Sequence, residues 1–121
     1  MILKKGETDM CTQNEAVVIL NEVCDACKTI FGSIKDAYLY GSYARGDYDD
    51  ESDVDILVTV ELTQKEISRH RWEMASLSSD LSLEHDITVS ISVKPAEQFE
   101  RYNTFYPFYQ NVIREGIKYA S

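Results

Sequence analysis

The sequence predicts an α/β (α+β) fold, in which helices alternate with a few short strands. Three observations lead to this prediction. The chain has 121 residues, which is the size of one domain with a single core. Its hydrophobic share of 44% and charged share of 27% are ordinary for a globular protein. Helical patterns alternate with β-prone runs, without a linker, a repeat or a low-complexity tract, so we expect one domain over residues 1–121.

The N-terminal half predicts one long helix and two strands. Thr12 and Glu15 form a capping box, and apolar residues follow at helical spacing, so a helix is expected from about Gln13 to Phe31. Gly32 ends it. Two β-prone runs follow, and they predict the strands Asp36–Tyr40 and Asp53–Val60.

The C-terminal half predicts further helices around one more strand. Thr63 and Glu66 form a second capping box, which starts a helix that reaches about Leu83. Strict alternation in "HDITVSISV" predicts the strand His85–Val93, with Asp86, Thr88, Ser90 and Ser92 on its polar face. Proline residues then open two helices, Ala96–Tyr102 after Pro95 and a last one from about Phe108 after Pro107, interrupted at Gly116.

Charge and hydropathy argue against several classes of function. The chain has 12 basic and 21 acidic residues, a net charge of −9, and no basic cluster beyond "SRHR". Binding to duplex nucleic acid depends on neutralising phosphates, so it is not expected. No apolar run is long enough to cross a membrane, and the N-terminus "MILKKGETDM" does not have the pattern of a signal peptide. We therefore expect a cytoplasmic protein.

The three cysteines agree with a reducing compartment. Cys24 and Cys27 form a CxxC pair, but no second pair of ligands and no preceding strand accompany it. We expect both thiols to pack as small apolar groups on one helix face, with a functional pair as the weaker alternative.

Two aspartates stand where the strand Asp53–Val60 begins. Residues i and i+2 of a strand share a face, so Asp53 and Asp55 lie side by side, roughly 6.6 Å apart at the backbone. Such carboxylates raise each other's pKa unless a positive charge neutralises them, and no Lys or Arg follows Arg45 nearby. Because Mg²⁺ prefers carboxylate and phosphate oxygens, the pair predicts a metal site rather than a solvated strand end.

A third carboxylate is expected from a neighbouring strand. Asp86 fits, since it begins the polar face of the third predicted strand, although a solvated turn residue would look the same.

The stretch "YLYGSYARG" predicts a phosphate-binding turn. Gly41 ends a strand, and Ser42 can cap a short helix whose free N–H groups attract phosphate. Arg45 either reaches a phosphate or pairs with Asp47 or Asp49 at the surface. A phosphate seat beside paired carboxylates suits nucleotidyl transfer, in which one metal ion activates the attacking hydroxyl and a second steadies pyrophosphate.

Gly41-Ser42 and Asp53-Val54-Asp55, ten residues apart, resemble the GSx10DxD signature of the DNA polymerase β-like nucleotidyltransferase superfamily. Within it, "GSYARGDYDDESDVDILV" resembles the minimal nucleotidyltransferases (MNT) of prokaryotes. The resemblance implies a small mixed β-sheet flanked by helices, two Mg²⁺ ions and ATP as donor. By position, Gly41 and Ser42 would hold the β- and γ-phosphates and Asp53 and Asp55 both metal ions. Asp86 would be a metal ligand and the base.

The same resemblance implies a partner. MNT proteins are commonly encoded beside HEPN-domain proteins as antitoxins, and some transfer AMP from ATP to a tyrosine of the HEPN ribonuclease toxin. We therefore expect a magnesium-dependent protein adenylyltransferase that acts as an antitoxin. Two alternatives stay open: a non-catalytic antitoxin that occludes its partner, and transfer to a small molecule such as an aminoglycoside. The donor base and the oligomeric state, including a homo-oligomer, are not fixed by the sequence.

Overall fold

The computed structural model describes residues 11–120. The N-terminal segment that we interpreted as lacking a signal peptide lies outside these residues. The described part begins with helix α2, Gln13–Phe31, which has the predicted bounds. Thr12 caps it by accepting a 3.1 Å hydrogen bond from the N–H of Glu15. Its buried face is small and apolar, consisting of Ala16, Ile19, Leu20, Val23, Cys24 and Cys27.

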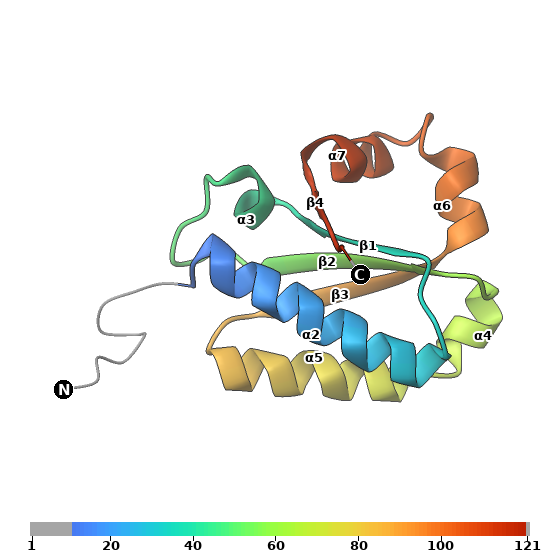
Figure 1. Cartoon of the computed structure of the whole chain (residues 1–121), viewed down its shortest axis with the longest axis horizontal. Coiled ribbons are helices and arrows are strands. Elements are labelled where there is room, and N and C mark those ends of the chain that lie inside the picture. Colours follow the sequence, from blue (N-terminus) through green and yellow to red (C-terminus); the bar gives the residue numbers. More distant parts are fainter. Residues whose placement is uncertain (1–10, 121) are drawn as a thin grey trace.

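The strands form one mixed sheet in the order β3-β2-β1-β4 (Figure 1). Strand β1, Asp36–Tyr40, runs antiparallel to both β2, Val54–Val60, and the short β4, Ile117–Lys118. Strand β3, Val89–Pro95, is parallel to β2 and lies at the edge of the sheet. The mixed sheet with flanking helices is therefore confirmed.

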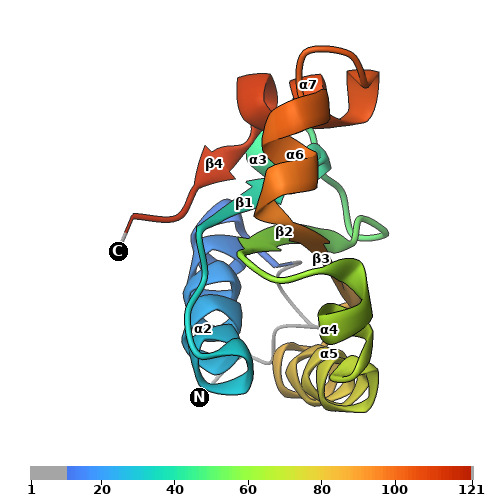
Figure 2. The same ribbon diagram turned by 90° about the vertical axis from the view of Figure 1, so that its right-hand side faces the viewer.

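Helices cover both faces of this sheet (Figure 2). Helices α2 and α5, Arg71–His85, pack on one face, where alternate β2 residues such as Val54 and Ile56 are fully buried. Helices α6, Ala96–Tyr102, and α7, Pro107–Glu115, pack on the other face around Leu57. The period of two in β2 thus divides its side chains between two cores. Among the described residues, no helix has the length and apolar character to span a membrane.

The single helix expected from Thr63 to about Leu83 is wrong, because the structure divides it. Helix α4, Gln64–Ser68, keeps the predicted capping box. The helix ends with hydrogen bonds between residues three apart, as in a 3₁₀ turn: the N–H of Arg69 donates to Glu66 O and the N–H of His70 donates to Ile67 O. His70 has non-helical backbone angles and acts as the N-cap of α5.

The start of the third strand was also predicted wrongly. Helix α5 continues to His85, and Asp86 is its C-cap in the left-handed conformation, with φ 54° and ψ 45°. The N–H groups of Asp86 and Ile87 both donate to Ser82 O. The side chain of Ser82 also accepts the N–H of Val89, at 2.9 Å, so the strand begins only there.

Helix α6 has the predicted bounds, and α7 begins at Pro107, the proline that was expected to open it, and ends before Gly116. The strand β4 was not expected. Gly116 turns the chain out of α7 close to the backbone of β1, where an added Cβ would collide with the carbonyl oxygen of Val112 and lie 3.0 Å from that of Leu39. The two residues after it then pair with Tyr38 and Leu39.

Candidate functional site

The candidate site lies at the end of the sheet where β1 ends and β2 and β3 begin, with helix α3, Ser42–Arg45, above it (Figure 1). The antiparallel register pairs Tyr40 with Asp55. The turn that follows Tyr40 is therefore brought directly against the start of β2.

Gly41 and Asp55 are in contact. A Cβ added to Gly41 would lie 2.7 Å from Asp55 Oδ2, and Gly41 has φ 77° and ψ −157°, a conformation that is almost restricted to glycine. The structure thus brings the Gly-Ser turn and the second aspartate of the DxD pair together. Both the space and the backbone angles require glycine here.

The acidic pair has no ion-pair partner in the part of the chain that the structure describes. Asp53 is exposed just before β2, and Asp55 is half-buried within it. Burial raises the pKa of Asp55, and the nearby charge of Asp53 raises it further. None of the ion pairs between described residues includes either aspartate. Two oxygen-donor side chains with unneutralised charge fit a divalent cation.

The turn that the sequence predicts as a phosphate seat is followed by a short helix, but its cap differs from the prediction. The N-cap of α3 is Gly41 and not Ser42, which is the first helical residue and makes no side-chain cap. Gly41 O accepts the N–H groups of Ala44 and Arg45, both at 3.1 Å. Ser42 and Tyr43 come before the first residues whose N–H groups donate within the helix, so their own N–H groups could donate hydrogen bonds to an oxyanion.

Residues that the sequence analysis did not identify hold α3 in place. Gln13 Nε2 donates to Tyr43 O at 2.9 Å and to Ala44 O at 3.4 Å, and its N–H donates to Tyr48 Oη. The rings of Tyr43 and Tyr48 stack with centroids 4.4 Å apart. Gln13 therefore fastens the start of α2 to the carbonyl end of α3. In the sequence, Gln13 follows the capping residue Thr12, and this position predicts only the start of a helix and no contact with α3.

We expect Gln13→Ala to lower the free energy of unfolding by about 1 kcal/mol, because it leaves the carbonyl oxygens of Tyr43 and Ala44 without this donor. Urea unfolding followed by circular dichroism measures the change. Asn14→Ala is the matched control, since Asn14 is exposed in the same helical turn. Equal stability of the two variants would contradict a bracing role for Gln13.

Arg45 adopts the surface alternative. Its Nε lies 3.2 Å from Asp47 Oδ2, and the two side chains are 41% and 64% exposed. An exposed pair of this kind contributes little to stability, so it is no obstacle to movement of Arg45 toward a bound anion.

Asp86 is not where it was predicted. As the C-cap of α5 it belongs to the helical layer and not to the polar face of β3. Among the described residues, the donor atoms of Glu22, Glu84 and His85 lie within 4.8 Å of one another, and none of Asp53, Asp55 and Asp86 belongs to such a group. That group contains a 2.8 Å contact between His85 Nε2 and Glu22 Oε1, which links α5 to α2.

The aromatic side chain of Tyr40 lies next to the acidic pair, because Tyr40 pairs with Asp55 in the sheet. Its ring packs edge-on against Phe108 of α7, with centroids 5.3 Å apart. Burial raises its pKa, the charge of Asp55 raises it further, and a hydrogen bond with Ser92 opposes this. The hydroxyl group therefore stays protonated at neutral pH, and Tyr40 spans from β1 toward β3 across the site.

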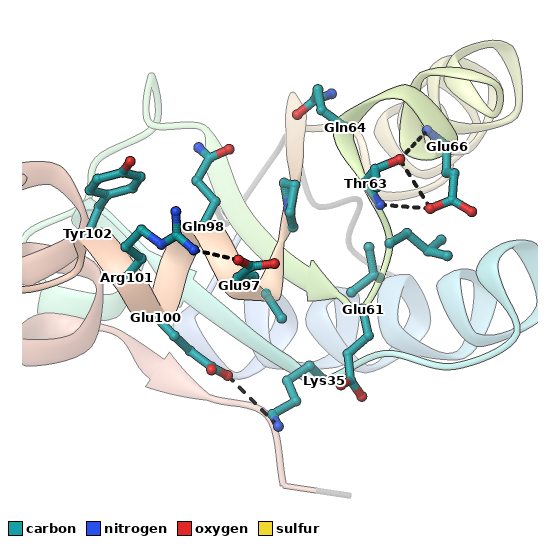
Figure 3. Close-up of a pocket in the computed structure, with 14 residues that line it drawn as sticks. Lys35, Glu61, Thr63, Gln64, Glu66, Glu97, Gln98, Glu100, Arg101 and Tyr102 are labelled. Carbon is teal, nitrogen blue, oxygen red and sulfur yellow. Dashed lines mark hydrogen bonds and ion pairs between the residues drawn. The ribbon is translucent and has the colours of Figure 1, made fainter.

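A cavity of about 580 Å³ lies at the opposite end of the sheet, between α4 and α6 (Figure 3). Its charged lining is mainly acidic, and its cations are paired, Lys35 with Glu100 and Arg101 with Glu97. None of the predicted site residues lines it. A triphosphate would meet unfavourable charge there, so we do not place the nucleotide in this cavity.

Known proteins resemble this chain in sequence and in fold. The family described as "Nucleotidyltransferase domain" matches residues 20–119. The Methanocaldococcus jannaschii protein named "Putative protein adenylyltransferase MJ0604" is 33% identical over 98 residues, which cover 80% of this chain and 90% of that protein.

Two solved structures extend the comparison to the fold. The structure described as "a putative nucleotidyltransferase from Sulfolobus solfataricus" has a TM-score of 0.57 at 20% identity, covering 88% of this chain and 80% of that one. The complex described as "tri-AMPylated Shewanella oneidensis HEPN toxin in complex with MNT antitoxin" contains a chain with a TM-score of 0.51 at 20% identity, covering 88% and 73%. At these identities the likeness concerns the fold.

Proposed function

Because the chain belongs to the nucleotidyltransferase domain family, we propose that it transfers AMP from ATP to a hydroxyl group of a partner protein in a magnesium-dependent reaction. The observation that carries this proposal is the contact between Gly41 and Asp55. It brings the turn that would bind the phosphates next to Asp55, which has no ion-pair partner among the described residues.

The residues of the site divide the work of the transfer. The N–H groups at the start of α3 would bind the β- and γ-phosphates, with Gly41 allowing their close approach. Asp53 and Asp55 would hold Mg²⁺, which when bound supplies charge neutralisation at the α-phosphate. Arg45 would leave its ion pair with Asp47 and bind a phosphate oxygen instead.

The transfer itself is a displacement at the α-phosphorus. The acceptor oxygen forms a bond to this phosphorus, the bond to the bridging oxygen of the β-phosphate breaks, and pyrophosphate leaves. The hydroxyl proton passes to solvent, since Asp53 is exposed and leaves this side of the site open to water. Asp86 receives no role as the base, because it caps α5.

The acceptor is proposed from the relatives. The name of the M. jannaschii protein specifies transfer to a protein, and the S. oneidensis complex pairs an MNT antitoxin with an AMPylated HEPN toxin. We propose a HEPN-domain partner with a tyrosine acceptor and an antitoxin role for this chain. An aromatic acceptor side chain would find Tyr40 and Phe108 beside the acidic pair.

The test is transfer of label from α-³²P-ATP to the protein encoded beside this chain. We expect a labelled partner in Mg²⁺ and no label in excess EDTA. Parallel reactions with labelled CTP, GTP and UTP measure the choice of base. Absence of label from every partner hydroxyl, under conditions in which the two proteins form a complex, would contradict the proposal.

Occlusion of the partner is the second candidate. A net charge of −9 favours it, because an acidic protein complements the basic surface of a ribonuclease. In cells that express the partner, the doubly substituted Asp53→Asn/Asp55→Asn chain distinguishes the two. Protection that survives with binding retained supports occlusion, and lost protection with binding retained supports transfer.

A further inference from the structure

Ser90 lies directly beside Asp55 in the sheet. The parallel register of β2 and β3 pairs these two residues. Neighbouring strands are about 4.8 Å apart, and residues in register point to the same face. Ser90 is exposed, and it stands next to the half-buried carboxylate.

The burial of β3 gives the direction of this side chain. Val89 is 1% exposed, and Ile91 and Val93 pack partly against the core formed with α2 and α5. The alternate residues Ser90 and Ser92 therefore face the other side, where Ser92 interacts with Tyr40. Ser90 thus belongs to the same face as Asp55.

Residue 90 is the position of the neighbouring strand that lies in register with Asp55. A carboxylate at residue 90 would add a third negative charge on the strand next to Asp55, about 4.8 Å away at the backbone. The chain instead has a neutral hydroxyl group there. Asp86, four residues earlier, is held at the end of α5 by the bonds to Ser82.

We propose that Ser90 occupies the third corner of the metal site, and that the site therefore binds its divalent ion weakly alone and more tightly together with the triphosphate. Two carboxylates supply too few oxygen ligands for tight binding, and the phosphate oxygens complete the coordination. The ion and the nucleotide then bind cooperatively, each raising the affinity for the other by the same factor. This inference rests on the proposed function, because it concerns the same metal and nucleotide.

Mn²⁺ binding tests the proposal without measuring activity. Free Mn²⁺ is followed by electron paramagnetic resonance during titration of the chain, alone and with a non-hydrolysable ATP analogue. For the unaltered chain we expect Mn²⁺ affinity at least about tenfold higher with the analogue than without it, after correction for binding by the analogue itself. For Ser90→Asp we expect affinity without nucleotide to rise at least about tenfold.

Ser90→Asn is the matched control, since it has the size of aspartate without the charge. It should bind Mn²⁺ as the unaltered chain does. Equal affinity of the unaltered chain with and without the analogue would overturn the proposal, as would a folded Ser90→Asp chain whose affinity equals that of Ser90→Asn. If Ser90→Asp does not fold, the unaltered chain still decides whether Mn²⁺ and the nucleotide analogue bind cooperatively.

Failure of this inference can be told from failure of the proposed function. A chain that labels its partner but binds Mn²⁺ equally well without nucleotide refutes only the role of Ser90. A chain that binds neither nucleotide nor Mn²⁺ refutes both.

Discussion

Asparagine at Asp53, at Asp55 or at both is expected to reduce AMP transfer at least about 1000-fold, a loss of about 4 kcal/mol in transition-state stabilisation. Each substitution removes an anionic oxygen ligand while it keeps the shape of the side chain. Initial rates of partner labelling measure the effect. Asp50→Asn changes the same charge in the exposed loop before β2 and should leave the rate unchanged.

The same substitution at Asp55 is expected to stabilise the chain without ligand by a few degrees in Tm. The folded chain disfavours the charged form of Asp55, because burial and Asp53 raise its pKa above the ordinary 3.8. A carboxyl group with a raised pKa costs stability above that pKa, and the cost disappears as pH falls toward 3.8. The stabilisation by Asp55→Asn should therefore be largest near pH 7 and shrink in acid.

Thermal unfolding in EDTA at several pH values checks this expectation. Asp53→Asn should give a smaller rise in Tm, since Asp53 is exposed. Loss of transfer together with loss of stability in Asp55→Asn would mean that the carboxylate supports the fold rather than the reaction.

Gly41→Ala is expected to reduce transfer by about 100-fold or more. The added Cβ would collide with Asp55 Oδ2, so the carboxylate must move, and misplacement by about 1 Å can cost that factor. The backbone of Gly41 adds strain of about 1–3 kcal/mol, because side chains almost never adopt its combination of φ and ψ. Nucleotide affinity and transfer rate should fall together.

Gly46→Ala separates the collision from backbone strain. Gly46 ends the same helix with φ 91°, and nothing lies within 4 Å of an added Cβ. This control should lose about 1 kcal/mol of stability and keep most of its activity. Equal loss of transfer in both glycine variants, measured on folded protein, would contradict a specific role for the contact with Asp55.

The elements that sequence analysis placed correctly carry their own boundary signals. Helix α2 has a capping threonine at one end and Gly32 at the other, and between them lies one apolar face. The second strand was predicted from Asp53, and the structure begins it one residue later, at Val54, so that only Asp55 of the acidic pair lies within it. Local chemistry was sufficient for the helix and nearly so for the strand.

The start of β3 failed because its signal is not local. His85 and Asp86 continue the alternation of the strand, but bonds to Ser82, one turn back, keep them at the end of the helix. Pairing of Asp55 with Ser90 likewise depends on register between strands, which one strand's pattern does not contain. The polar face of β3 was therefore predicted to begin at Asp86, which the structure instead places at the end of α5.

The packing of the CxxC pair has a practical consequence. Cys24 and Cys27 are free thiols with no exposed surface, and burial raises the pKa of each to about 12. A thiol reagent attacks the thiolate, so modification has to wait for the helix to leave the core. The rate at which a reagent alkylates these thiols therefore measures how often α2 opens transiently in the native protein. A partner or a nucleotide that stabilises the folded chain should lower this rate, so binding can be detected without a fluorescent or isotopic label.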